Sequence, residues 1–234
     1  MEAKIDWLDR FHRYLEEEKS LSSHTVKSYT SDIKDFLKFV LSQKKDLKGV
    51  GYPTVREYLE SLQKKERKKS TLARRVASLR SFFYFLYLKG HLRSFPLSGM
   101  RGPKRGRKIP AYLEEEEVQR LLNAAEGEDF IHGRDRAILE LLYATGMRAA
   151  ELVNLKVEDL DFGSETAKVR GKGSKERIIP VGSYAVKALT TYLPMRKEKA
   201  KPGVKALFVN RFGGRLSDRS LRKKLNQYLE LANI

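Results

Sequence analysis

An arginine stands where two predicted helices meet, a place where its charge is unusual. In the stretch ATGMRAAEL, residues 144–152, Arg148 follows a Thr-Gly pair that ends one apolar helical pattern. A helix N-terminus already carries partial positive charge, so a cation there is disfavoured unless an anion joins it. Backbone approach is unhindered at Gly146, and a guanidinium fork suits two phosphate oxygens. Two interpretations follow: Glu151 orients a phosphate-binding fork, or it pairs with an ordinary surface arginine.

A second basic group lies in the segment RGKGSKER, residues 170–177. Two β-rich runs flank a Gly-Lys-Gly-Ser turn, which predicts a β-hairpin with Lys172 at its tip. A compact lysine ammonium on such a tip can reach into a groove and donate a proton. The alternative is a solvated basic turn. From these two stretches taken separately, both interpretations stay open.

The elements that must position these residues are mainly helical. In the first hundred residues, apolar side chains recur at three- and four-residue spacing and predict a bundle of four short helices, over 5–18, 21–43, 54–66 and 70–90. The aromatic run SFFYFLYL in the fourth helix either packs in the core or stacks on bases, and packing is the simpler interpretation. Residues 96–109 show no periodicity and form a basic linker, which is either solvated or lies along a phosphate backbone.

The second half mixes helices with one small sheet. Its helical patterns cover 114–127, 133–146, 147–162, 182–200 and 216–234, and the hairpin lies among them. A brief apolar run, ALFVN, precedes the closing helix. The expected fold is therefore mainly α, with a four-helix N-terminal domain and a second domain of helices around a small antiparallel β-sheet.

Charge and composition limit the classes of function. The 234 residues carry 48 Lys and Arg against 30 Asp and Glu, a formal net charge of +18, and residues 1–108 hold 26 basic and 12 acidic groups. This asymmetry favours a polyanionic partner, nucleic acid before a membrane surface, although a lysine-rich surface adapted to heat or solubility is the alternative. The absence of cysteine excludes disulfides and thiolate metal sites and fits a cytoplasmic protein. We expect no metal, no cofactor and no membrane segment.

Taken together, these stretches resemble the tyrosine recombinases, and within them the Xer-type enzymes that resolve chromosome dimers. ATGMRAAELVNLKVEDLDF is similar to the family's first arginine box, and VRGKGSKERIIPV to its β-hairpin lysine segment. LSSHTVKSYTSDIKDFLKFV and TLARRVASLRSFFYFLYLKG resemble its core-binding domain. The resemblance implies a SAM-like core-binding domain over 1–95, a basic linker over 96–109 and a catalytic domain over 110–234.

The same resemblance implies an activity: site-specific cleavage and rejoining of DNA strands through a 3′-phosphotyrosine, without a metal. Arg148 would clamp the phosphate, Lys172 would protonate the leaving 5′-oxygen, and Glu151 would support the arginine. The implied partner is a double-stranded recombination site held by a recombinase tetramer on two duplexes, with a second recombinase as a candidate member. The two domains would close around the duplex as a clamp. The candidate DNA contacts are Lys27, Arg74, Arg75, Arg80, Arg105, Lys175, Arg177, Arg219 and Arg222.

Two departures from the family pattern qualify this implication. Ala150 stands where the family usually has a serine or a similar residue, and no H-x-x-R occurs in residues 1–234. None of the 11 tyrosines is identified as the nucleophile by motif. We therefore expect a catalytic domain truncated before its C-terminal motifs, which binds DNA and does not cleave it. The alternatives are a recombinase whose C-terminal segment lies outside this sequence, a naturally truncated, non-catalytic protein that occupies recombination sites, and a basic helical protein for other nucleic acid.

Overall fold

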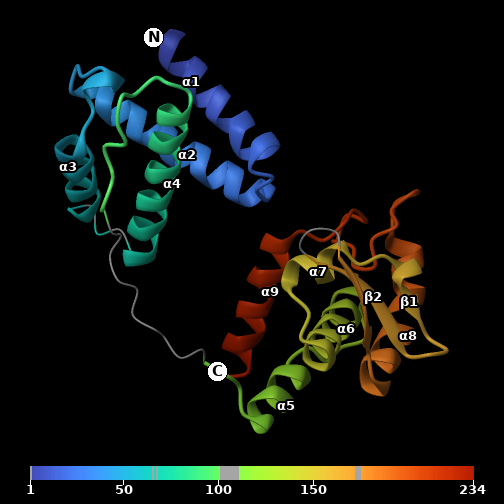
Figure 1. The fold of residues 1–234 in the computed structure, drawn as a ribbon. Coiled ribbons are helices and arrows are strands. Elements are labelled where there is room, and N and C mark those ends of the chain that lie inside the picture. Colours follow the sequence, from blue (N-terminus) through green and yellow to red (C-terminus); the bar gives the residue numbers. More distant parts are fainter. Residues whose placement is uncertain (1, 65, 67, 101–110, 172–174) are drawn as a thin grey trace. The chain divides into compact units, whose positions relative to one another are not determined.

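The protein is mainly helical and forms two compact units. The computed structural model describes residues 2–64, 66, 68–100, 111–171 and 175–234. Unit 1 is Met1–Ile109 and unit 2 is Pro110–Ile234 (Figure 1). Most of the predicted linker, residues 101–109, lies outside the described part of the chain, so the expected domain limits stay a prediction.

Unit 1 is a helical bundle in which α2 contacts each of the other three long helices. Phe82, Phe83 and Phe85 of α4 are fully buried, and the ring of Phe11 meets that of Phe82 edge to face at 5.1 Å. The packing interpretation of the aromatic run is therefore confirmed for its phenylalanines. The helices are α1 (Glu2–Arg13), which continues into a π-helical turn (Tyr14–Glu18), α2 (Ser23–Ser42), a 3-10 turn (Leu47–Gly49), α3 (Tyr52–Gln63) and α4 (Lys69–Leu88).

Unit 2 has helices packed against one face of a small sheet. α6 packs along α8, while α9 contacts both α7 and α5 (Figure 1). The strands form an antiparallel sheet in the order β1-β2-β3. The elements are α5 (Glu115–Asn123), α6 (Phe130–Thr145), α7 (Ala149–Asn154), a 3-10 turn (Val157–Asp159), β1 (Leu160–Asp161), β2 (Thr166–Arg170), β3 (Glu176–Pro180), α8 (Ser183–Lys199) and α9 (Asp218–Leu231).

The helix expected over residues 147–162 is wrong beyond Asn154. Leu155 has an extended backbone, with ψ at 138°. The amide of Leu207 donates to the Leu155 carbonyl at 2.7 Å, and the amide of Val157 donates to the Lys205 carbonyl at 3.2 Å. Backbone pairing with this distant apolar run therefore replaces the helical hydrogen bonds, which local periodicity could not indicate.

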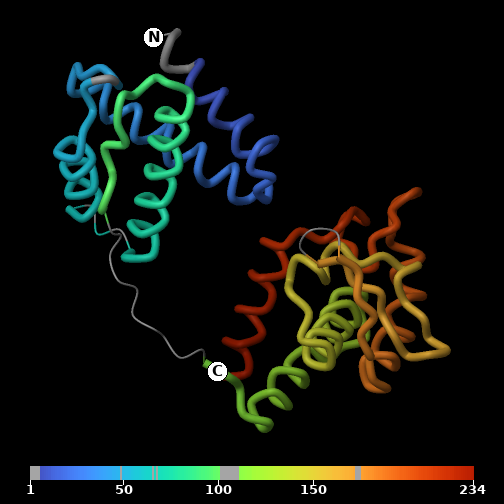
Figure 2. Tube along the Cα trace, viewed as in Figure 1, coloured from blue at the N-terminus to red at the C-terminus, as the bar shows by residue number. Residues whose placement is uncertain are grey.

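Unit 2 ends beside the place where it begins. Arg120 on α5 donates from Nε to the carbonyl of Ala232 at 3.2 Å. Tyr228 on α9 shares a small apolar cluster with Val118 and Leu122 of α5, against which Leu113 packs. The last turn of α9 is thus fixed against α5, and the trace in Figure 2 shows the C-terminus next to the start of this unit.

Candidate functional site

Arg148 lies at the junction between α6 and α7. Gly146 ends α6 in the left-handed conformation, with φ at 57°, and its amide donates to the Leu142 carbonyl at 2.9 Å. Only glycine adopts this backbone without strain, so the turn depends on it. Arg148 then takes an extended backbone as the N-cap of α7, and its carbonyl accepts the amide of Leu152 at 3.0 Å. Its side chain is 78% exposed, so the guanidinium reaches solvent.

Glu151 holds this arginine from a buried position. Its side chain is 6% exposed and lies in the first turn of α7. Oε2 accepts the backbone amide of Arg148 at 2.9 Å, and Oε1 accepts the Arg148 Nη1 group at 3.1 Å. The carboxylate thus fixes both the backbone and the guanidinium of Arg148. Its negative charge also offsets the cation at a helix N-terminus.

Arg177 completes an Arg–Glu–Arg triad, formed by Arg148, Glu151 and Arg177. From β3, its Nη1 and Nη2 groups donate to Oε1 and Oε2 of Glu151 at 3.0 and 2.8 Å, in a two-pronged arrangement. Hydrogen bonding from Arg177 is the largest cause that lowers the pKa of Glu151 to about 2, against the raising effect of burial. The carboxylate therefore stays ionised between its two arginines.

The hairpin around Lys172 is described only at its base. The amide of Gly171 donates to the Lys175 carbonyl at 2.8 Å, which closes the two arms. On the outer face, Lys168 and Arg170 both pair with Glu176, at 2.6 and 2.8 Å. Lys172 lies outside the described residues, so its position relative to Arg148 stays a prediction.

Two candidate DNA contacts of unit 1 fasten its helices together. Arg74 donates to the buried carboxylate of Asp32 on α2. Arg75, whose side chain is 12% exposed, donates to Tyr58 and pairs with Asp35 at 2.8 Å. Both arginines therefore join α4 to neighbouring helices, and a DNA contact by either stays a prediction.

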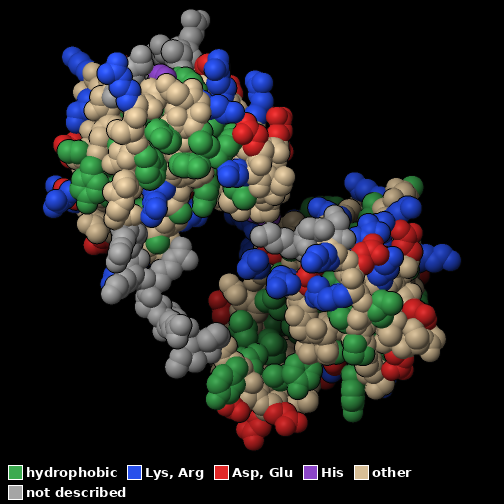
Figure 3. Space-filling model, in the orientation of Figure 1, with side chains coloured by type: hydrophobic (Ala, Val, Ile, Leu, Met, Phe, Trp, Pro, Cys, Tyr) green, Lys and Arg blue, Asp and Glu red, His purple; other side chains and the backbone are tan. Residues whose placement is uncertain are grey.

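The remaining candidate contacts are more accessible. Lys27, Arg80, Lys175, Arg219 and Arg222 are exposed. Arg80 donates to the carbonyl of Met100 at 3.0 Å, and Arg222 pairs with Asp218 at 3.0 Å. In unit 2, Lys and Arg side chains gather over α7 and the base of the hairpin, whereas Asp and Glu side chains gather over α5 (Figure 3). Arg105 lies outside the described residues.

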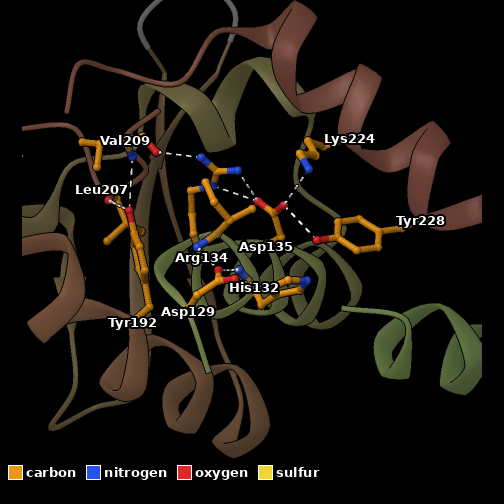
Figure 4. Close-up of polar contacts among 10 residues, drawn as sticks. Asp129, His132, Arg134, Asp135, Tyr192, Leu207, Val209, Lys224 and Tyr228 are labelled. Carbon is orange, nitrogen blue, oxygen red and sulfur yellow. Dashed lines mark hydrogen bonds and ion pairs between the residues drawn. The ribbon is translucent and has the colours of Figure 1, made fainter. Parts of the chain in front are cut away.

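A buried polar cluster, which the sequence did not reveal, anchors α9 (Figure 4). Arg134 and Asp135 on α6 are both 3% exposed at the side chain and pair at 2.6 Å. Asp135 also accepts the Tyr228 hydroxyl at 3.0 Å, and Lys224 lies 3.8 Å from it. Both Lys224 and Tyr228 come from α9, so one carboxylate ties that helix to α6. The only local signal was a pair of charges at the start of an apolar helical pattern.

Two tyrosines of unit 2 are unsuited to attack a phosphate. The Tyr192 hydroxyl donates to the Leu207 carbonyl at 3.3 Å, and burial raises its pKa to about 12. Burial, and then the Asp135 carboxylate, raise the pKa of Tyr228. Both hydroxyls are enclosed and resist the deprotonation that a nucleophile requires.

Within the residues that the structure describes, no group of three or more His, Asp or Glu side chains could hold a metal ion. In the same part of the chain, no helix is both long and apolar enough to cross a bilayer.

Two family models match the chain. Residues 111–234 match the phage integrase family, and residues 8–90 match the phage integrase N-terminal SAM-like domain. The chain belongs to the phage integrase family. Among the relatives of this family member is a protein named tyrosine recombinase XerC from Syntrophus aciditrophicus, 39% identical over 97% of this chain and 78% of the relative. The XerC of Oceanobacillus iheyensis is 37% identical over 97% of this chain and 76% of the relative.

Solved structures of integrases and recombinases share its fold. A lambda integrase dimer bound to a COC′ core site has a TM-score of 0.76 at 18% identity, over 98% of this chain and 63% of that one. XerH bound to a palindromic difH substrate also has a TM-score of 0.76, at 20% identity, over 98% and 79%. The predicted fold class and the resemblance to Xer-type tyrosine recombinases are thus confirmed.

Proposed function

We propose that this chain is a site-specific DNA recombinase of the Xer type, which cleaves and rejoins strands through a 3′-phosphotyrosine. The Arg–Glu–Arg triad carries the proposal. An exposed guanidinium, held by a buried carboxylate at a helix N-terminus, is a preorganised cation for a phosphate oxygen. Family membership and the XerC relatives give the reaction class.

In this proposal Arg148 balances the negative charge that develops on the transferred phosphoryl group. Such transfers depend mainly on positioning and electrostatic stabilisation. Lys172 directly follows Gly171, which lies at the base of the hairpin. The Lys172 ammonium would protonate the leaving 5′-oxygen. Glu151 fixes the direction of Arg148 and takes no part in bond making. The attacking group is a tyrosine, and the burial of Tyr192 and Tyr228 argues against either of them.

The proposed substrate is duplex DNA, bound by both units, with phosphate contacts providing most of the affinity. Relatives in fold include a lambda integrase tetramer bound to a Holliday junction. By analogy, we propose a tetramer on two duplexes, with a second recombinase as a candidate member. A chromosomal substrate would place this activity in the cytoplasm. The contacts proposed for DNA are Lys27, Arg74, Arg75, Arg80, Arg105, Lys175, Arg219 and Arg222.

Binding is tested first, with a pool of duplexes that carry a randomised stretch. The chain should select a defined site, and its affinity should fall steeply between about 50 and 200 mM salt, because bound cations release counterions. Selection of no sequence, or an affinity insensitive to salt, would contradict the proposal.

Cleavage is tested separately, because residues 1–234 contain no H-x-x-R motif. We propose that this polypeptide by itself binds the selected site without forming a covalent link. A duplex nicked beside the expected cleavage position traps any phosphotyrosine, which a denaturing gel then shows as a shifted protein band. A covalent band would refute this part of the proposal, and mapping the linked peptide would identify the tyrosine.

A further inference from the structure

We infer that Arg177 is a positioning residue that holds Arg148 and the hairpin in one arrangement, and that it does not bind a DNA phosphate. The inference rests on the proposed function, because it assigns a role within the same site. It also changes the role expected for Arg177, which the sequence placed among the DNA contacts.

The register of the sheet directs Arg177 towards α7. Residues directly opposite each other on antiparallel strands point to the same face. Arg177 pairs with Val169, and Ile179 pairs with Ala167. Val169 and Ala167 are buried, so this is the core face. The side chain of Arg177 therefore leaves the sheet on its core face, near the first residue of β3.

The two arginines of the triad differ in the number of side-chain hydrogen bonds that they donate to Glu151. Arg177 commits both Nη groups to Glu151, and its side chain is 41% exposed. Arg148 donates to Glu151 from one Nη group and is 78% exposed. The Glu151 carboxylate thus occupies a two-pronged edge of the Arg177 guanidinium, whereas it takes only one Nη group of Arg148. The more exposed Arg148 is thus the phosphate ligand, and Arg177 holds the carboxylate that aims it.

Gly171 brings the other arm of the hairpin against the triad. A Cβ at this residue would lie 3.4 Å from Nη1 of Arg177 and 3.7 Å from Oε1 of Glu151. Gly171, at the end of one arm, and the side chain of Arg177, from the other arm, therefore both lie against the Glu151 carboxylate. Because Lys172 is the next residue in the chain, a change at Arg177 should disturb both proposed catalytic groups together.

The decisive variant is R177K, which keeps the positive charge and loses the guanidinium fork. With the selected duplex as probe, R177K and R177Q should both raise Kd about fivefold, a typical coupling between residues in contact. The slope of log affinity against log salt should stay unchanged in both. R148Q should lower that slope by about 1, as expected for a lost phosphate contact. If R177K binds like the native chain, or R177Q lowers the slope by about 1, the inference is overturned.

A second measurement needs no DNA. In R177Q, carbon-detected NMR should show the pKa of Glu151 rising towards its usual value, and hydrogen exchange of the Arg148 amide should quicken. R170Q is the matched control, because Arg170 pairs with Glu176 on the outer face and should change neither signal. Unchanged exchange of the Arg148 amide in a folded R177Q variant, verified by circular dichroism, would overturn the inference. If the native chain bound no duplex, the proposed function would fail, while this measurement would still decide the role of Arg177.

Discussion

At the scale of single residues, the site depends on a carboxylate that is neither exposed nor reactive. Glu151 receives hydrogen bonds from the backbone and side chain of Arg148 and from both Nη groups of Arg177. With one negative and two positive charges, the triad keeps a net charge of +1. Arg148 is the most exposed member of the triad, so the net positive charge of the triad faces solvent.

This arrangement predicts how stability depends on pH. The pKa of Glu151 is about 2 in the folded protein, against an ordinary value of 4.5. A lowered pKa stabilises the fold above the unfolded value, and this stabilisation is lost as pH falls from about 4.5 to 2. E151Q should cost about 3 kcal/mol at neutral pH and flatten the dependence over that window, as measured by urea unfolding. E126Q is the control, because Glu126 is 70% exposed and pairs with Arg136 at 3.6 Å, and it should leave the curve nearly unchanged.

The sequence predicted part of this site and missed the rest for physical reasons. An arginine and a glutamate three residues apart at a helix start lie within reach of each other, so Arg148 and Glu151 could be paired in advance. The inward direction of Arg177 could not, because it depends on the register of a hairpin. Asp135 and Tyr228 are 93 residues apart and meet only through the packing of α6 and α9.

At the scale of elements, polar contacts of unequal strength hold α9 against α6. Asp135 neutralises Arg134, which is buried and also donates to the Val209 carbonyl at 3.1 Å. D135A should destabilise unit 2 by about 3–5 kcal/mol, because it leaves a buried charge unpaired. Y228F removes one hydrogen bond and should cost about 1 kcal/mol. Urea unfolding compares the two, with Y184F as control, since Tyr184 is 80% exposed. Equal losses in the first two variants would contradict this ranking.

The turn between α6 and α7 gives a second prediction at this scale. A Cβ at Gly146 meets nothing within 4 Å, so the whole cost of a side chain there comes from its positive φ. G146A should therefore destabilise the protein by about 1–2 kcal/mol and weaken binding of the selected duplex, because Arg148 follows two residues later. Gly49 has equally open surroundings and no positive φ. G49A should therefore have little effect on thermal unfolding, and a loss similar to that of G146A would count against the backbone explanation.

At the scale of the whole molecule, charge is divided unequally between the units. Residues 1–108 carry 26 basic and 12 acidic groups out of totals of 48 and 30, which leaves a net +14 there and +4 in the rest. Each unit has its own buried core, so the two can be prepared separately. On a non-specific duplex, residues 1–109 should show a steeper salt dependence than residues 110–234, because more counterions are released. An equal or steeper slope for unit 2 would mean that net charge does not determine the number of phosphate contacts.

The hydrogen bond from Arg120 to the carbonyl of Ala232 has a consequence for the connectivity of unit 2. Since the turn after α9 lies beside α5, residues 112–234 can be joined in a different order without separating these two helices. A short glycine-serine bridge from Ile234 to Tyr112, with new termini opened in the exposed turn at Gly163 and Ser164, would give a circular permutant that keeps the core contacts and opens only the turn in which Asp161 accepts both amides. Such a permutant should unfold cooperatively and keep the Arg148 amide protected. Its folding rate, more than its stability, should change, because only the sequence separation of its contacts is altered.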